Sequence, residues 1–303
     1  MPPTDTLPVL VGIDAEPDVD AVLELAAAEA VRRSCAVHLV HAVPPPSPSA
    51  DPVAADTLAC QRTFAGTEAL VNAARNLEDL LGGAQPVTTE LAHEEPVAAL
   101  VNRSRDACLV LLLRRPRLLR RPPDGVVKGV ASRALVPVVV VPSTWRRYRQ
   151  HQPLISVGVE DYDTSAPVVR AALEVARFRR AGLRMVHAWR PGDIGLDDPE
   201  AGTWSEFDHD ARLTKELLHD FGPLVSEYPD VRADLVISHD RPDEALVEEG
   251  DAVSLVVVGR HRPRAGAARH VGPIARVVLR EAPCPVMVVE PHTAPRTLTA
   301  PAR

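Results

Sequence analysis

An internal repeat constrains this chain more than any other feature of its sequence. The segment Val11–Asp14 (Val-Gly-Ile-Asp) returns as Val157–Glu160 (Val-Gly-Val-Glu), 146 residues later. The segments Val40–Val43 and Pro96–Val101 return at the same spacing. Chance similarity does not hold one register over about a hundred residues, and self-similarity at a fixed spacing is the signature of repeated architecture. The chain is therefore predicted to contain two copies of one domain, fused in tandem.

The spacing between the copies changes only near their ends. There Val136–Val138 corresponds to Cys284–Val286, 148 residues later, so a net insertion of two residues lies between about 114 and 136. The length of 303 residues suits two domains of this size. We expect a first domain at 1–142, a linker at 143–153, a second domain at 154–290 and a loose tail at 291–303.

Each copy alternates short apolar runs with longer segments rich in Ala, Leu and Glu, which predicts strands that alternate with helices. Because the strands are apolar throughout, we expect a parallel sheet that helices cover on both faces. Asp18 is the expected N-cap of the first helix, and Gly82 and Gly83 the expected end of the second. The expected elements of the first copy are strands at 9–13, 37–43, 87–91, 109–113 and 138–141, and helices at 21–33, 56–81, 96–104 and 126–134. In the second copy the expected strands are 155–159, 183–188, 233–237, 255–258 and 286–289.

Composition limits the classes of function. A net charge of −7 and an aromatic content of 3% argue against nucleic-acid binding, which uses basic surfaces and aromatic stacking. No apolar run approaches the roughly 18 residues that span a bilayer, and no signal-like segment precedes the first strand. We therefore expect a cytoplasmic protein without a membrane or nucleic-acid partner. None of the cysteines lies in a CxxC pair, so buried free thiols in a reducing compartment are expected at Cys35, Cys60, Cys108 and Cys284.

In a doubly wound sheet, ligands bind outside the carboxyl ends of the strands, where the strand order reverses. The first and fourth strands flank that point, which places Asp14 there in the first copy and Glu160 and Gly259 in the second. Accessible backbone N–H groups and the N-terminus of the next helix would favour a phosphate group at this edge. In the second copy Gly272 allows close approach and Pro273 suits the first helical position, although the proline removes one N–H donor.

Taken together, these segments resemble the universal stress protein family. The resemblance covers about 290 residues and is carried by the two starts quoted above, by Val-His-Ala-Trp (Val186–Trp189), by Val-Val-Val-Gly (Val256–Gly259) and by Ala282–Val286. It implies two doubly wound α/β domains with Rossmann-like parallel sheets of strand order 3-2-1-4-5. It also implies a cytoplasmic protein that is often dimeric and often binds ATP. ATP-binding members carry Gly-x2-Gly-x9-Gly-Ser/Thr after the fourth strand and an Asp at the end of the first.

On that pattern, the second copy keeps part of the phosphate-binding loop. Gly259 and Gly272 match the first and third glycines. Arg262 stands where the second glycine belongs, Pro273 stands where Ser or Thr belongs, and Ala275 replaces a further hydroxyl residue. The resemblance thus implies a weakened site in the second domain.

The remaining positions of the pattern separate the two copies. Glu160 takes the place of the Asp, and Ala188 falls where the family contacts adenine. In the first copy Asp14 and Ala42 match these positions, but Leu113 replaces the first glycine. We expect ATP, if it binds, in the second domain only, with no metal centre. The expected nucleotide-binding residues are Glu160, Ala188, Gly259, Arg260, Arg262, Gly272 and Pro273, and a vestigial first-domain site is expected at Asp14 and Ala42.

Arginines gather after the fourth strand in both copies. Two interpretations stay open: a solvated loop, or an anion site in which guanidinium groups replace the lost backbone donors, since arginine pairs bidentately with phosphate. The arginines concerned are Arg114, Arg115, Arg117, Arg120 and Arg121 in the first copy, and Arg260, Arg262, Arg264 and Arg269 in the second.

No catalytic constellation is expected. His93–Glu95 lacks the second histidine of a zinc helix, and no serine or cysteine lies in a nucleophile elbow. His41 and His187 end the second strand of each copy, and we expect them to be partly buried and hydrogen-bonded.

Three functional hypotheses follow. The first is a tandem, non-enzymatic stress-response factor that binds an adenine nucleotide in its second domain. The alternative is a nucleotide-free interaction or scaffold protein that assembles through edge strands at Val138–Val141 and Val286–Val289, either between its two domains or as a homodimer. An ATP-hydrolysing enzyme is the least supported, because the sequence shows no general base and no metal-binding carboxylate cluster.

Overall fold

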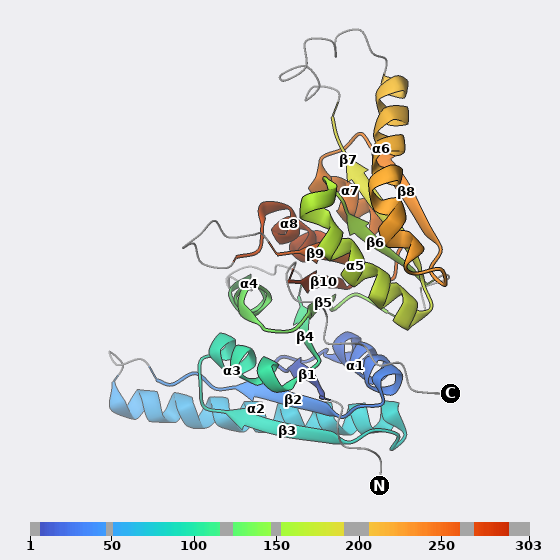
Figure 1. Ribbon diagram of the computed structural model, residues 1–303. Helices are drawn as coiled ribbons and strands as arrows, with labels where there is room; N and C mark the ends of the chain where they lie inside the picture. Colours follow the sequence, from blue (N-terminus) through green and yellow to red (C-terminus); the bar gives the residue numbers. More distant parts are fainter. Residues whose placement is uncertain are drawn as a thin grey trace. The chain divides into compact units, whose positions relative to one another are not determined.

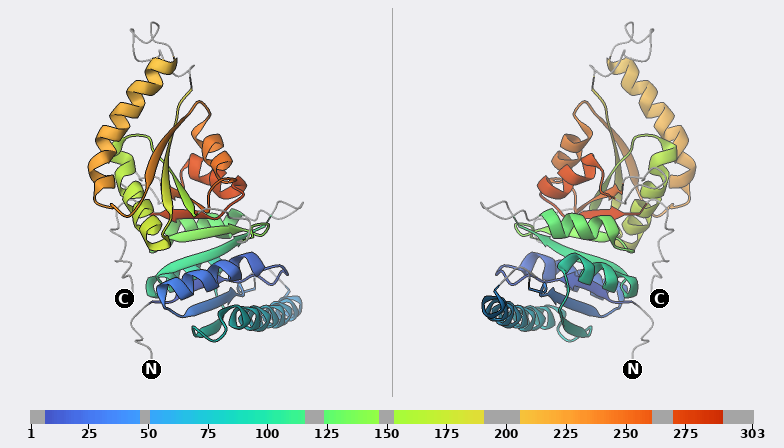
Figure 2. Two further views of the ribbon diagram at one scale, coloured as in Figure 1. Left: turned by 90° about the vertical axis from the view of Figure 1, so that its right-hand side faces the viewer. Right: turned by 90° about the vertical axis from the view of Figure 1, so that its left-hand side faces the viewer.

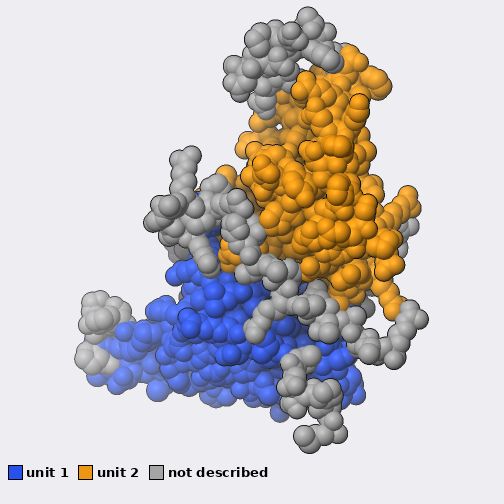
Figure 3. All heavy atoms as spheres, in the orientation of Figure 1, with its two compact units in different colours: residues 1–149, 265–270, 299–303 blue, residues 150–264, 271–298 orange. Residues whose placement is uncertain are grey.

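Both halves of the chain consist of parallel strands joined by helices, as expected (Figure 1). The computed structural model describes residues 7–46, 51–115, 124–146, 153–190, 206–260 and 270–290. The chain divides into two compact units, formed mainly by residues 1–149 and by residues 150–264 and 271–298 (Figure 3). No helix in the described ranges combines the length and the apolar character needed to cross a bilayer.

The first unit contains a five-stranded parallel sheet with the expected order, β3-β2-β1-β4-β5. Helices α1 and α2 pack together, as do α3 and α4, so the sheet is covered by two helix pairs. The strands are β1 (Val9–Gly12), β2 (Val37–Ala42), β3 (Val87–Ala92), β4 (Leu109–Arg114) and β5 (Val138–Pro142). The helices are α1 (Asp20–Arg33), α2 (Pro52–Leu81), α3 (Pro96–Arg103) and α4 (Asp124–Arg133), with a 3-10 turn at Ser104–Asp106.

The second unit repeats this topology, with strand order β8-β7-β6-β9-β10. Its helix pairs are α5 with α6 and α7 with α8, and Figure 2 shows each sheet with its helices from two further sides. The strands are β6 (Leu154–Gly158), β7 (Gly182–Ala188), β8 (Ala233–Ser238), β9 (Leu255–Gly259) and β10 (Val286–Val289). The helices are α5 (Tyr162–Arg179), α6 (Glu206–Ser226), α7 (Pro242–Glu249) and α8 (Pro273–Glu281).

The prediction that Asp18 caps the first helix is wrong. Helix α1 begins at Asp20, its N-cap is Val19, and no side chain caps it. Asp18 instead has a φ of 69°, whereas a capping side chain needs a backbone near the β region. The start is still favoured electrostatically, because the carboxylate of Asp20 lies in the first turn, near the positive end of the helix dipole.

Helix α2 begins four residues earlier than expected, and its end is confirmed. Asp51 caps the start by accepting the N–H of Val53 at 2.9 Å, and Pro52 occupies the first turn. At the other end Gly82 has a φ of 56° and closes the helix in the left-handed conformation that glycine adopts without strain.

The expectation that all four cysteines are buried is wrong for one of them. Cys35 and Cys284 are buried and Cys108 is half-buried, but Cys60 is exposed on α2. An amphipathic helix has one face exposed to solvent, and Cys60 lies on that face of α2 among polar residues. Residues 147–152 of the expected linker and the tail at 291–303 lie outside the described residues.

Candidate functional site

Three of the predicted site residues meet at one edge of the second sheet. The register of β6 with β7 and with β9 brings the carboxyl ends of these strands side by side. Ala188 is the last residue of β7, Gly259 is the last residue of β9, and Glu160 follows β6 between them. This is the point at which the strand order reverses, where doubly wound sheets bind ligands.

Glu160 presents an exposed side chain at this edge. Its backbone N–H donates to Oγ of Ser165 at 2.9 Å, which fixes the turn that leads from β6 into α5. The neighbouring Asp161 caps α5 by accepting the N–H of Thr164 at 2.8 Å. Because that carboxylate already serves the start of α5, this helix end does not attract a phosphate group.

Gly259 is required by packing. A Cβ atom at this position would lie 2.6 Å from Cγ2 of Val168 in α5, well inside van der Waals contact. The glycine therefore lets α5 approach the end of β9, whether or not a ligand binds there. A larger residue at position 259 would disturb the fold itself.

Helix α8 begins as the sequence predicts. Gly272 is its N-cap, with an extended backbone at φ −60° and ψ 168°, and Pro273 occupies the first turn. The side chain of Pro273 is exposed and Gly272 is buried. Residues 261–269, which contain Arg262, Arg264 and Arg269, lie outside the described residues.

Arg260 is directed towards a carboxylate of the chain itself. Its side chain is 2% exposed, and Nη1 donates to Oε2 of Glu290 at 3.0 Å. Its backbone N–H also donates to the carbonyl of Val289 at 3.0 Å, so the residue ties the ends of β9 and β10 together. An anion at this buried guanidinium would compete with the half-buried carboxylate of Glu290.

In the first unit an arginine occupies the equivalent edge. Arg115, directly after β4, pairs with Asp14 through Nη2–Oδ1 at 2.9 Å and Nε–Oδ2 at 3.2 Å. The same guanidinium donates to the carbonyls of Glu16 at 3.1 Å and Pro17 at 2.5 Å. The hydrogen bonds to Asp14 raise the pKa of Arg115. The vestigial position Asp14 is thus held by the chain's own cation, while Ala42 remains at the end of β2.

The two repeated histidines have the structural role expected of them. Nδ1 of His41 bonds the carbonyl of Ile13 at 2.8 Å, and Nδ1 of His187 bonds that of Val159 at 3.1 Å. Because a carbonyl only accepts, Nδ1 carries the proton in both rings. Burial lowers the pKa of His187, which keeps this ring neutral near pH 7.

A polar aromatic cluster lies next to Ala188 and is not predicted by the sequence. Nε1 of Trp189 donates to Oδ1 of Asp210 at 2.9 Å, and Nε2 of His239 lies 3.0 Å from Oδ2 of the same carboxylate. The Trp189 ring meets His209 and His239 edge-on, at centroid distances of 4.5 and 4.8 Å. The members come from the end of β7, from α6 and from the end of β8, so no local motif marks them. One sequence difference does point to the cluster: the second copy has Trp189 after the strand, where the first copy has Val43.

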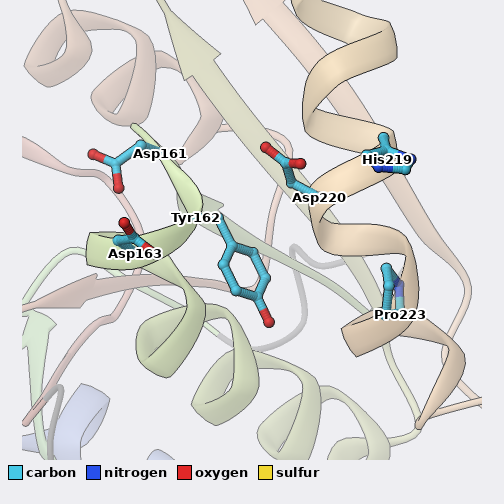
Figure 4. A pocket seen from close by; sticks show the side chains of 6 residues that line it. All are labelled: Asp161, Tyr162, Asp163, His219, Asp220 and Pro223. Atoms are coloured by element: carbon cyan, nitrogen blue, oxygen red, sulfur yellow. The ribbon is translucent and has the colours of Figure 1, made fainter.

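A surface hollow lies between the first turn of α5 and the C-terminal half of α6 (Figure 4). Its lining residues are Asp161, Tyr162, Asp163, His219, Asp220 and Pro223. Three of these residues are aspartates, and their negative charge disfavours a phosphate group. Within the described ranges, no group of three or more His, Cys, Asp or Glu side chains is placed to hold a metal ion.

Comparison with known proteins gives consistent matches. The Universal stress protein family matches residues 7–142 and 154–290. A protein of Mycolicibacterium smegmatis named universal stress protein is 29% identical over 294 residues, which cover 94% of this chain and 97% of that protein. The crystal structure of a universal stress protein from Archaeoglobus fulgidus has a TM-score of 0.64 at 15% identity, and covers 93% of this chain and 98% of that chain. A structure of a universal stress protein from Archaeoglobus fulgidus in complex with dAMP covers 44% of this chain and 97% of that chain, at 21% identity and a TM-score of 0.34.

Proposed function

The chain belongs to the universal stress protein family in a tandem form, and from this premise we propose that it is a non-enzymatic stress-response factor with one adenine-nucleotide site, in its second domain. The observation that supports this proposal is the asymmetry of the two switch points. In the first unit Arg115 holds Asp14 and fills the ligand edge. In the second unit the matching Glu160 is exposed beside the small side chain of Ala188.

The chemistry of the second edge suits a nucleoside with a weakly held phosphate chain. We expect a planar base to lie against the small side chain of Ala188 at the end of β7, where the carboxylate of Glu160 would accept hydrogen bonds from a ribose hydroxyl or an amine. The phosphates would point to the start of α8, where Gly272 is the N-cap and no described side chain caps the helix. Because Pro273 lacks an N–H, this end offers one donor fewer than usual.

The alternative function is a nucleotide-free scaffold, and the composition of two strands favours it. Strands β5 and β10 each flank the fourth strand of their own repeat. Val138–Val141 and Val286–Val289 contain no charged residue that would oppose pairing with another strand. In this alternative the two domains, or two chains, assemble through these segments.

A matched pair of variants tests the proposed site. Ala188→Phe places a ring where the base would lie, and Ala42→Phe makes the same change in the first repeat. Nucleotide released from the denatured protein is quantified, and binding of ATP is titrated. We expect about one nucleotide per chain, and a loss of affinity of at least about tenfold in Ala188→Phe but not in Ala42→Phe.

Other outcomes distinguish the alternatives. Equal loss in both variants, or two nucleotides per chain, would contradict a site confined to the second domain. If no nucleotide is released and millimolar ATP does not raise the melting temperature, the nucleotide proposal fails. A native mass that stays monomeric at all concentrations would contradict a homodimeric scaffold. Gly259→Val is unsuitable here, because it would collide with Val168 in the absence of any ligand.

A further inference from the structure

Two cysteine thiols of the first unit meet at the amino ends of its strands, on the opposite edge from Asp14. Cys35 lies between α1 and β2, and Cys108 directly precedes β4. The N–H of Cys108 donates to the carbonyl of Pro8 at 3.0 Å, and the N–H of Val9 donates to that of Ala36 at 2.9 Å. The two cysteines therefore flank the start of β1 from either side, and their thiols hydrogen-bond to each other.

The surroundings make the two thiols unequal. Cys35 is 2% exposed, whereas Cys108 is half-buried. The hydrogen bond from Cys35 and the nearby guanidinium of Arg33 lower the pKa of Cys108, against burial and the carboxylate of Glu29. The hydrogen bond to Cys108 and burial raise the pKa of Cys35. Cys108 is thus the better nucleophile, and Cys35 holds its proton.

The charged groups around the pair are themselves paired. Glu29 of α1 is fully buried and forms ion pairs with Arg32 and Arg33 of the same helix, the latter at 3.0 Å. This arrangement holds the guanidinium of Arg33 close enough to lower the pKa of both thiols through its charge. A positive charge next to a half-buried thiol is the environment that favours a reactive thiolate.

The pair belongs to the first repeat only. Ala181 and Ser254 occupy the matching positions of the second repeat, where Oγ of Ser254 donates to the carbonyl of Leu154 at 2.8 Å. The other two cysteines have different surroundings. Cys60 is exposed on α2, and the buried Sγ of Cys284 donates to the carbonyl of Pro285 at 3.4 Å.

We propose that Cys35 and Cys108 form a redox modification site, which a hydroperoxide converts to a reversible disulfide within the first domain. The Cys108 thiolate attacks the peroxide, the O–O bond breaks, and a sulfenic acid forms on Cys108 while water or an alcohol leaves. The Cys35 sulfur then attacks the Cys108 sulfur, an S–S bond forms, and water leaves with the proton of Cys35. In total, two thiols give up two electrons and two protons, and the hydroperoxide accepts them. A dithiol reductant reverses the change by exchange.

The test maps disulfides in the full chain. The protein is treated with hydrogen peroxide, unfolded in the presence of an alkylating reagent, and digested without reduction for mass spectrometry. We expect the peptides of Cys35 and Cys108 to be linked with the loss of two hydrogen atoms, and dithiothreitol to restore both thiols. If both cysteines remain fully alkylated while Cys60 is oxidised, the proposal is wrong.

Variants taken from the second repeat assign the two roles. Cys35→Ala and Cys108→Ser introduce the residues that the matching positions of the second repeat already carry, and Cys60→Ser is the control. In Cys35→Ala we expect Cys108 to accumulate a sulfenic acid that dimedone labels, and in Cys108→Ser we expect Cys35 to stay reduced. Cys60→Ser should leave the link unchanged. Faster oxidation of Cys35 than of Cys108 would reverse the roles and overturn the proposed order. Should a variant fail to fold, the mapping of the unchanged chain and of Cys60→Ser still decides the proposal.

Discussion

Glu90 of β3 is held by an arginine and a histidine from neighbouring elements. Nε of Arg103 in α3 donates to Oε2 of Glu90 at 2.8 Å, and Nε2 of His38 in β2 lies 3.1 Å from the same oxygen. The hydrogen bonds from Arg103, followed by that from His38, lower the pKa of Glu90 to about 2 from 4.5. The unfolded chain therefore binds the proton first as the pH falls. The stabilisation from this carboxylate is complete above about pH 4.5 and is lost as the pH falls towards 2.

We predict that Glu90→Gln lowers the free energy of unfolding of the first domain by about 1 kcal/mol at pH 7, since the pair is partly exposed and screened by solvent. The difference between wild type and variant should shrink between pH 4.5 and pH 2. Urea denaturation at pH 7, 4 and 3 measures it, with Glu68→Gln on the exposed face of α2 as the control. A difference that is the same at pH 3 as at pH 7 would exclude the ion pairs as its cause.

For single residues, the sequence predicts which positions lie close together but not which side chains bind them. In a parallel sheet the carboxyl ends of the strands lie at one edge. The sequence therefore predicts that edge as the location of Asp14, Ala42, Glu160, Ala188 and Gly259. The partner of Arg115 was not predictable from spacing, since Asp14 is 101 residues away. The structure pairs this arginine with a carboxylate of the same domain, a partner that neither interpretation of the arginine-rich loops includes.

Among the elements, helix α2 depends on a glycine near its middle. A Cβ atom on Gly66 would lie 2.3 Å from Cδ2 of His41, whose ring packs against the helix backbone. In α6, by contrast, a Cβ atom on Gly222 would meet no described heavy atom within 4 Å. The two helices therefore carry glycine for different reasons, and only α2 needs it for close packing.

Gly66→Ala should destabilise the first domain by about 1–3 kcal/mol, because the methyl group displaces the His41 ring or the helix. Gly222→Ala should instead stabilise the second domain by about 0.5–1 kcal/mol, the ordinary gain in helix propensity. Chemical denaturation followed by circular dichroism measures both. A stabilising effect of Gly66→Ala would show that His41 moves aside at no cost.

The elements themselves were largely predictable, and the errors fell at their ends. The apolar runs predict the strands because buried parallel strands are apolar throughout. The expected start of α2 lies four residues too late because Pro52 follows a proline-rich run that is typical of a loop, although proline suits the first turn of a helix. The left-handed backbone of Asp18 carries no sequence signal, so its capping role was expected from residue type alone.

For the whole molecule, the duplication was the most informative feature, since it predicted two sheets of the same strand order. In the part of the chain that the structure describes, each unit has five strands, its own helix pairs and its own apolar core. A domain of about 150 residues buries roughly 68–70% of its unfolded surface, enough to fold without staples. Residues 1–149 and 150–303, produced separately, should therefore each give a cooperative thermal transition with circular dichroism typical of α/β structure. A fragment that melts without cooperativity would show that it needs the other half.

The ion pair between Arg115 and Asp14 also has a consequence for any ligand titration of the intact chain. A guanidinium that already has its counter-ion within the fold gains little from exchanging it for a phosphate, so the first domain should stay empty as nucleotide is added. Binding should then follow a single hyperbola without a Hill coefficient above one. By linkage, the melting temperature of the second domain alone should rise with the logarithm of nucleotide concentration. The melting transitions of the two domains would then separate as nucleotide is added. The unchanged transition of the first domain would serve as an internal reference for that of the second.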